Sequence, residues 1–72
     1  MSTLCYLVFP SIHDVLAAEA ALLHAGLPFD LAPTPLKIST DCGMVIEVAP
    51  TDRLKIATAL RKCGLDFTEV QA

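Results

Sequence analysis

Residues 33–43 form the longest stretch of this chain without helical or alternating hydrophobic periodicity, and they carry most of its reactive chemistry. Within this stretch, Cys42 stands directly before Gly43. Long irregular connections in very small proteins are more often functional than accidental. We therefore predict that Cys42 presents its thiol on a loop and is the reactive residue. The loop residues that accompany it are Lys37, Ser39 and Thr40.

The neighbours of Cys42 decide how readily its thiol ionises. A cysteine acts as a nucleophile or carrier in the thiolate form, which nearby positive charge favours. A helix N-terminus supplies about half an elementary charge, and Lys37 or His13 adds to it if the loop folds toward them. Gly43 leaves the sulfur open to an approaching chain. Asp41 disfavours the thiolate, which argues against a protease-like nucleophile more than against a carrier.

Composition limits the classes of function. The net charge of −3 and the scattered basic residues argue against general nucleic-acid binding, because neutralising phosphates requires clustered Lys and Arg. With 54% hydrophobic residues in a chain of 72, the protein either buries its helices and sheet efficiently or leaves an apolar face for a partner. The length suits one domain spanning residues 1–72.

The start of the chain and its cysteines predict a location. Residues 1–3 carry no positive charge, unlike a signal peptide, and no apolar run approaches the ~20 residues of a membrane span. Three cysteines without close spacing do not suggest a disulfide framework. We therefore expect a cytoplasmic protein with free thiols and no membrane association.

Hydrophobic patterns and turn residues predict six elements. Pro10 ends the first strand, Ser11 is placed to cap a helix, and Gly26 and Gly64 are placed to terminate the two helices. Strands are predicted at residues 4–9, 29–32, 44–49 and 67–70; helices are predicted at 12–25 and from Thr51 or Asp52 through Cys63. The first strand reads as central and buried on both faces, and the second and fourth as edge strands.

A weak internal repeat predicts the fold. Residues 21–29 parallel residues 59–67, each segment running from the end of a helix through a glycine to a phenylalanine. Two strand–helix–strand halves in tandem give the α+β, ferredoxin-like βαββαβ sandwich, with two helices on one face of a four-stranded antiparallel sheet. In this topology Cys42 lies at the same end of the sheet as residues 9–11, His13 and the end of the second helix.

Helical periodicity also predicts which side chains face inward. The predicted inward arcs are Ile12, Val15, Leu16, Leu22 and Leu23 in the first helix, and Ile56, Ala57, Ala59, Leu60 and Cys63 in the second. Glu19 falls in the middle of the first arc. We expect it to pair with Arg53 or Lys55, or to face an oligomer interface.

The remaining reactive residues each have a structural interpretation beside the functional one. His13 is either an acid or base partner of Cys42 or, more commonly for this position, a solvated first-turn residue. Cys63 is either a resolving thiol for Cys42 or a buried packing residue, and its inward position favours packing. Cys5 reads as a core residue.

Several kinds of site are missing from the sequence. There is no Cys-x-x-Cys pair, no zinc-type Cys/His spacing and no Gly-rich phosphate loop. The first strand offers Tyr6 and the third no aromatic residue, so the sheet lacks the stacking platform of RNA-recognition domains. We expect neither a metal nor a cofactor.

The motifs that carry a family resemblance are residues 9–14, Ala18–Glu19, Leu22, residues 25–28 and above all residues 33–43. Over nearly its whole length the chain resembles the selenium/sulfur carrier protein-like family of small bacterial domains. That family shows Pro-Thr-Pro, a basic residue and serine-rich residues before Cys-Gly. Thr40–Asp41 departs from this pattern, which leaves a hydroxyl contribution at position 41 without support.

The resemblance implies a carrier, rather than an enzyme with independent turnover, that holds sulfur or selenium on Cys42 as a persulfide or selenosulfide. Its partners would be donor and acceptor proteins, the donor being of the cysteine desulfurase type. Two alternatives stay open. The chain is a regulatory or oligomerising module that works through its apolar surfaces, or it is a redox sensor that pairs Cys42 with Cys63.

Overall fold

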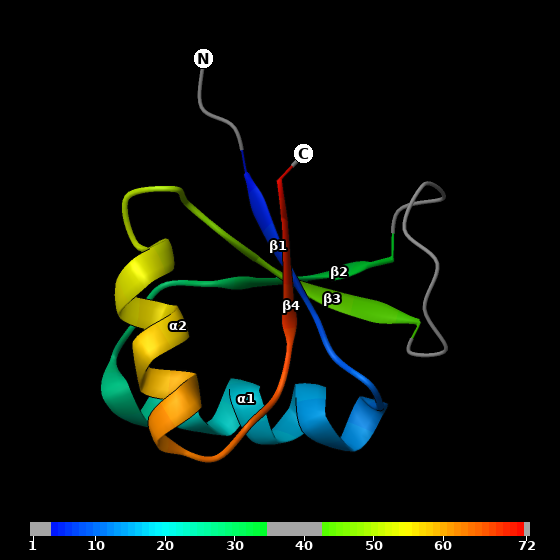
Figure 1. The fold of residues 1–72 in the computed structure, drawn as a ribbon, viewed down its shortest axis with the longest axis horizontal. Helices are drawn as coiled ribbons and strands as arrows, with labels where there is room; N and C mark the ends of the chain where they lie inside the picture. The colour runs from blue at the N-terminus through cyan, green and yellow to red at the C-terminus, as the bar shows by residue number, and fades with distance from the viewer. Residues whose placement is uncertain (1–3, 35–42, 72) are drawn as a thin grey trace.

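The computed structural model describes residues 4–34 and 43–71. In the described residues the elements follow the order β1 (Cys5–Val8), α1 (Ile12–Ala25), β2 (Asp30–Pro33), β3 (Met44–Val48), α2 (Arg53–Lys62) and β4 (Thr68–Gln71) (Figure 1). The predicted βαββαβ order is confirmed. Each strand begins or ends within two residues of its predicted bounds, the usual uncertainty at element ends.

The strands form one antiparallel sheet in the order β2-β3-β1-β4. Leu7 lies opposite Ile46 on one side and Glu69 on the other. Residues from β1, β3, α1 and α2 share one buried core, so both helices pack on the same face of the sheet. The core residues are Cys5, Leu7, Phe9, Val15, Ala18, Leu22, Ile46, Val48, Ile56 and Leu60. This arrangement is the predicted ferredoxin-like sandwich.

The edge positions of β2 and β4 are as predicted. β1 is central, but only one of its faces is fully buried. Cys5 and Leu7 face the helices with no exposed surface, whereas Tyr6 and Val8 alternate to the other face and stay partly exposed. The prediction that β1 is buried on both faces was therefore wrong: its buried residues alternate with partly exposed ones along the strand.

Local chemistry fixes the ends of α1. The Ser11 hydroxyl accepts a hydrogen bond from the Asp14 backbone N–H at 3.3 Å, as an N-cap does. Gly26 follows the helix at φ 71°, and its N–H reaches the carbonyls of Leu22 and Leu23. Both caps were predicted from the sequence. Asp52 stands at the N-cap of α2 but forms no side-chain cap hydrogen bond.

The buried face of α1 differs from the predicted one. Val15, Ala18 and Leu22 are completely buried, whereas Ile12, Leu16 and Leu23 are 42, 52 and 66% exposed. Two overlapping arcs of apolar residues run along this helix, and both fit the helical repeat of about 3.6 residues per turn. Packing selects the arc that contains Ala18, which is completely buried in the core. The predicted inward positions of Ile12, Leu16 and Leu23 were wrong.

Candidate functional site

The ends of β2 and β3 hold the base of the connection that contains Cys42. Pro33 lies opposite Met44 in the β2–β3 register, and the Thr34 N–H donates a hydrogen bond of 3.1 Å to the Gly43 carbonyl. Gly43 is covalently bonded to Cys42, so the described structure holds the chain in place one residue from the thiol. Residues 35–42, and with them Lys37, Ser39, Thr40 and Cys42, lie outside the described residues. Their roles stay predictions.

The strand register decides which other residues reach this end of the sheet. β1 ends at Val8, opposite the first residue of β4, Thr68, and Leu7 pairs with Ile46 near the start of β3. Figure 1 shows the start of α1 on the same side of the molecule as the end of β2 and the start of β3. His13 is an exposed residue in the first turn of α1. Its action on Cys42 stays a prediction.

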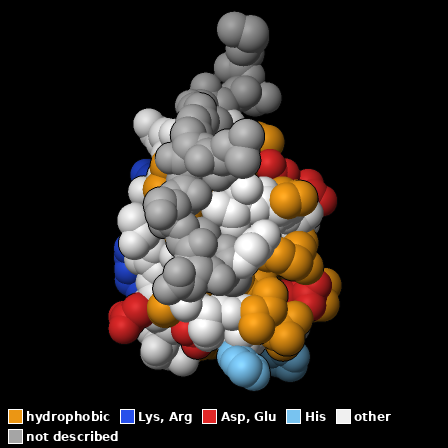
Figure 2. Space-filling view, turned by 90° about the vertical axis from the view of Figure 1, so that its right-hand side faces the viewer, with side chains coloured by type: hydrophobic (Ala, Val, Ile, Leu, Met, Phe, Trp, Pro, Cys, Tyr) orange, Lys and Arg blue, Asp and Glu red, His pale blue; other side chains and the backbone are white. Residues whose placement is uncertain are grey.

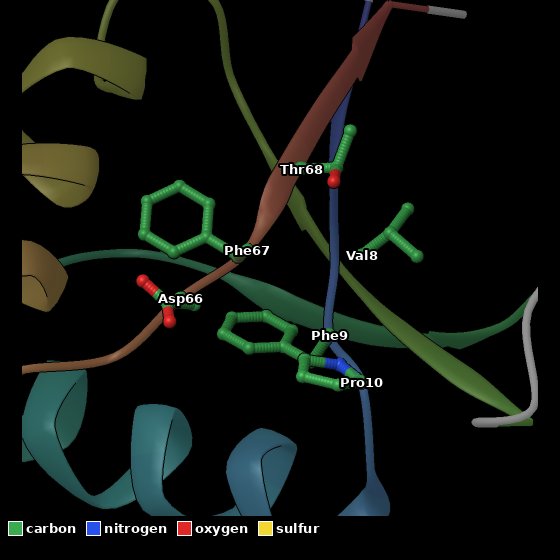
Figure 3. A pocket seen from close by; sticks show the side chains of 6 residues that line it. All are labelled: Val8, Phe9, Pro10, Asp66, Phe67 and Thr68. Atoms are coloured by element: carbon green, nitrogen blue, oxygen red, sulfur yellow. The ribbon is translucent and has the colours of Figure 1, made fainter.

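An open cavity of about 330 Å³ lies at the same end of the sheet, which the sequence patterns did not predict. Its lining is Val8, Phe9, Pro10, Asp66, Phe67 and Thr68. In Figure 3 the Asp66 carboxylate lies beside the Phe67 and Phe9 rings, and Val8 lies on the other side of the β1 ribbon. The two ring centroids are 5.6 Å apart. The lining contains no thiol, imidazole or amine, so this cavity can bind an apolar group but offers little chemistry.

The two described cysteines differ in their surroundings. Cys5 is completely buried in the core, as predicted. Cys63 is exposed, so the prediction that it packs inside was wrong. α2 ends at Lys62, and Cys63 has left the helical conformation at φ −84° and ψ 1°. The buried residues of α2 are Ile56, Ala57 and Leu60, so the buried arc of the helix ends before Cys63.

The exposure of Cys63 leaves the alternative of a disulfide with Cys42 chemically open, but the strand order separates the two segments. The connection that contains Cys42 joins β2 to β3, whereas Cys63 leads into β4 on the far side of β1. Two strand spacings of ~4.8 Å separate β3 from β4. In Figure 1 the end of α2 also lies on the opposite side of the molecule from the start of β3.

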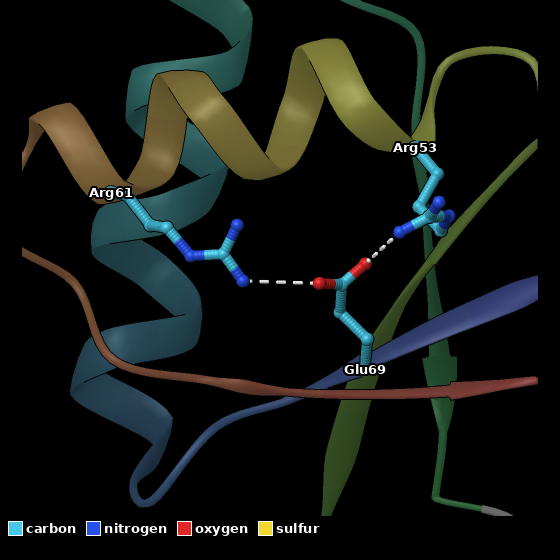
Figure 4. A network of polar contacts seen from close by, with 3 residues as sticks. All are labelled: Arg53, Arg61 and Glu69. Carbon is cyan, nitrogen blue, oxygen red and sulfur yellow. Dashed lines mark hydrogen bonds and ion pairs between the residues drawn. The ribbon is translucent and has the colours of Figure 1, made fainter.

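Among the described residues, the acidic side chain that binds arginine is that of Glu69 on β4 (Figure 4). Its carboxylate accepts hydrogen bonds from Arg53 at 2.8 Å and Arg61 at 3.1 Å. The Arg53 hydrogen bond lowers the pKa of Glu69, with partial burial opposing and Arg61 assisting. The ion pairs within residues 4–34 and 43–71 both belong to Glu69, so the expected pairing of Glu19 with Arg53 or Lys55 was wrong. Arg53 and Glu69 meet through long-range packing that no local pattern predicts.

Neither metal nor membrane features occur in the described part of the chain. Within residues 4–34 and 43–71, no three His, Cys, Asp or Glu side chains are grouped as metal ligands would be. Of the two described helices, neither is long and apolar enough to cross a bilayer.

Comparison with protein-family models matches residues 4–71 to the family described as "Putative Se/S carrier protein-like". The chain belongs to that family. The match begins before β1 and ends with β4, so it covers the whole sandwich and the connection with Cys42. No curated protein and no solved structure matches this member of the Se/S carrier protein-like family.

Proposed function

We propose that the protein carries sulfur or selenium on Cys42 between a donor and an acceptor protein. The family match across residues 4–71 is the observation that carries the proposal. The Thr34–Gly43 hydrogen bond supports it, because it ties down the chain next to Cys42 without using the thiol. A carrier requires a thiol that both partners reach, rather than a set of catalytic groups.

Loading and delivery are both thiolate exchanges. The Cys42 thiolate attacks the outer sulfur of a persulfide on the donor; a new S–S bond forms, the donor's S–S bond breaks, and the donor leaves as a thiolate with the bonding electron pair. In delivery, an acceptor nucleophile attacks the outer sulfur, and Cys42 leaves as the thiolate. Neither step needs an outside oxidant or reductant. The same exchange applies to selenium.

Intact-mass measurement tests the proposal. We expect the wild-type protein, incubated with a cysteine desulfurase and cysteine, to gain the mass of one sulfur atom that a thiol reductant removes. The Cys42→Ser variant should gain none, although the exposed Cys63 is still present. A gain that persists in Cys42→Ser would move the carrier site to Cys63. Absence of any gain with several donors would contradict the proposal.

The exposure of Cys63 supports a second candidate, a redox sensor in which Cys42 and Cys63 form a disulfide. Peptide mapping without reductant after mild oxidation distinguishes this candidate from the carrier. A Cys42–Cys63 peptide under conditions that leave Cys42 unloaded by donors would favour the sensor.

A further inference from the structure

An apolar stripe runs along the exposed side of α1. Ile12, Leu16 and Leu23 are 42, 52 and 66% exposed, and their spacing, with Glu19 between the two leucines, places them in line along the helix. Leu31 on β2 is 36% exposed. We call the four residues Ile12, Leu16, Leu23 and Leu31 the α1–β2 patch.

The packing of α1 places the stripe on the β2 side of the molecule. α1 packs against β3 and α2. Ala21, on one side of the buried arc, packs against the core, and the stripe follows the opposite side, away from α2. Leu31 pairs with the buried Ile46, so it lies on the helix-covered face of the edge strand next to β3. Figure 2 shows hydrophobic side chains gathered around an acidic one, directly above the histidines, both of which belong to α1.

The charge at the centre of this stripe is unpaired within the described residues. Glu19 lies one turn from Leu16 and one turn from Leu23, and both ion pairs of residues 4–34 and 43–71 belong to Glu69. A partner that covers the leucines also desolvates this carboxylate, which costs free energy unless the partner supplies a cation. The complementary surface is therefore apolar with a Lys or Arg at its centre.

The area of the patch argues against a second copy as its occupant. At these exposed fractions the four side chains present on the order of 400 Å² of apolar surface. A standard stable interface buries roughly 800 Å² per partner. A two-fold dimer through α1 would also bring the two Glu19 side chains onto the same flank, where like charges repel. A small apolar patch suits an encounter that forms and dissociates at each transfer.

We propose that the α1–β2 patch docks the protein that loads Cys42, through an apolar segment that places a Lys or Arg against Glu19. This inference rests on the proposed carrier function. β2 continues from Leu31 to Pro33, and Thr34 then holds Gly43. A partner seated on the patch therefore lies beside the anchored base of the connection that contains Cys42.

The test compares two leucines of equal exposure on different helices. Leu23 on α1 is 66% exposed and Leu54 on α2 is 67% exposed, so Leu23→Asp and Leu54→Asp add the same charge at equally solvated positions. The donor is a cysteine desulfurase that loads the wild-type protein, and the initial loading rate is measured by intact mass at low carrier concentration. We expect Leu23→Asp to slow loading by roughly tenfold and Leu54→Asp to leave it unchanged.

Glu19 provides a second, independent variant. Glu19→Lys should slow loading by the desulfurase at least as much as Glu19→Gln, because it opposes the cation of the partner. All variants should accept sulfur from glutathione persulfide at the wild-type rate, since a small donor needs no docking surface. Thermal unfolding of each variant checks that the fold is retained.

The outcomes separate this inference from the carrier function. Equal desulfurase rates for wild type and Leu23→Asp would overturn the docking inference alone, and so would faster loading of Glu19→Lys. A loss of dimer mass in Leu23→Asp by light scattering would assign the patch to a second copy and overturn it too. A wild-type protein that no donor loads would overturn both the carrier function and the docking inference.

Discussion

At the residue scale, the two described thiols have opposite accessibility, although the sequence favoured a packing role for both. Cys5 is completely buried among core residues, whereas Cys63 is exposed beyond the last residue of α2. A buried thiol in an apolar core behaves as a small hydrophobic side chain and does not react until the protein opens. Cys63 is the thiol that any assay of Cys42 must take into account.

Thiol titration checks this difference in the Cys42→Ser variant, which keeps Cys5 and Cys63. We expect the Cys63 thiol to react promptly with Ellman's reagent in the native protein. The Cys5 thiol should react only in denaturant, because the reagent reaches it only when the protein unfolds. Cys42→Ser/Cys63→Ser should show no prompt reaction. Prompt modification of two thiols in native Cys42→Ser would show that Cys5 is not in the core.

At the element scale, α1 presents two different apolar faces. Val15, Ala18 and Leu22 pack against the sheet, and Ile12, Leu16 and Leu23 remain in solvent. The exposed leucines contribute little to stability because they bury little surface. They are available for a partner without cost to the fold, which is the physical basis of the proposed docking surface.

Adjacent leucines test the orientation of α1. Leu22 is completely buried and Leu23 is 66% exposed. Leu22→Ala should therefore lower the free energy of unfolding by roughly 2–5 kcal/mol through lost burial and a cavity, and Leu23→Ala by no more than about 0.5 kcal/mol. Urea unfolding of the two variants measures both. Similar losses would show that both leucines face the sheet, as the sequence predicted, and a larger loss for Leu23→Ala would contradict the observed orientation of the helix.

At the scale of the whole molecule, the last strand is tied to α2 by side chains as well as by the sheet. Glu69 on β4 binds Arg53 and Arg61 near the two ends of α2. The Arg61 guanidinium also lies 5.0 Å from the centre of the Phe67 ring, which in turn contacts Phe9. These contacts hold the edge strand and its preceding turn against the rest of the sandwich.

Stability should therefore depend on pH through Glu69. Arg53 lowers the pKa of this carboxyl group in the folded protein. The ionised carboxylate therefore contributes its full stabilisation above the ordinary glutamate pKa of about 4.3, and this stabilisation is lost as the pH falls through the lowered pKa. Because the arginines are largely solvated, we expect about 1 kcal/mol or less. Between pH 7 and pH 3, the free energy of unfolding measured in urea should decrease less for Glu69→Gln than for wild type. Equal losses would contradict the role of Glu69.

Local residue chemistry made much of the fold predictable from the sequence. Ser11 and Gly26 mark the ends of α1 because capping depends on residues next to each other in the chain. The paired strand–helix–strand halves predicted the sheet, since few topologies accommodate that order. Cys42 is a candidate because of its own loop motif, and its placement lies outside the described residues.

The tertiary structure decided what depends on contacts between distant segments. The choice between two apolar faces of α1, the partner of Arg53 and the cavity beside Phe9 each depend on residues far apart in the chain. Helical periodicity shows that an apolar side exists, but two overlapping arcs satisfy it equally well. Only the packing of Val15, Ala18 and Leu22 in the core shows which arc faces the sheet, and therefore which leucines remain exposed.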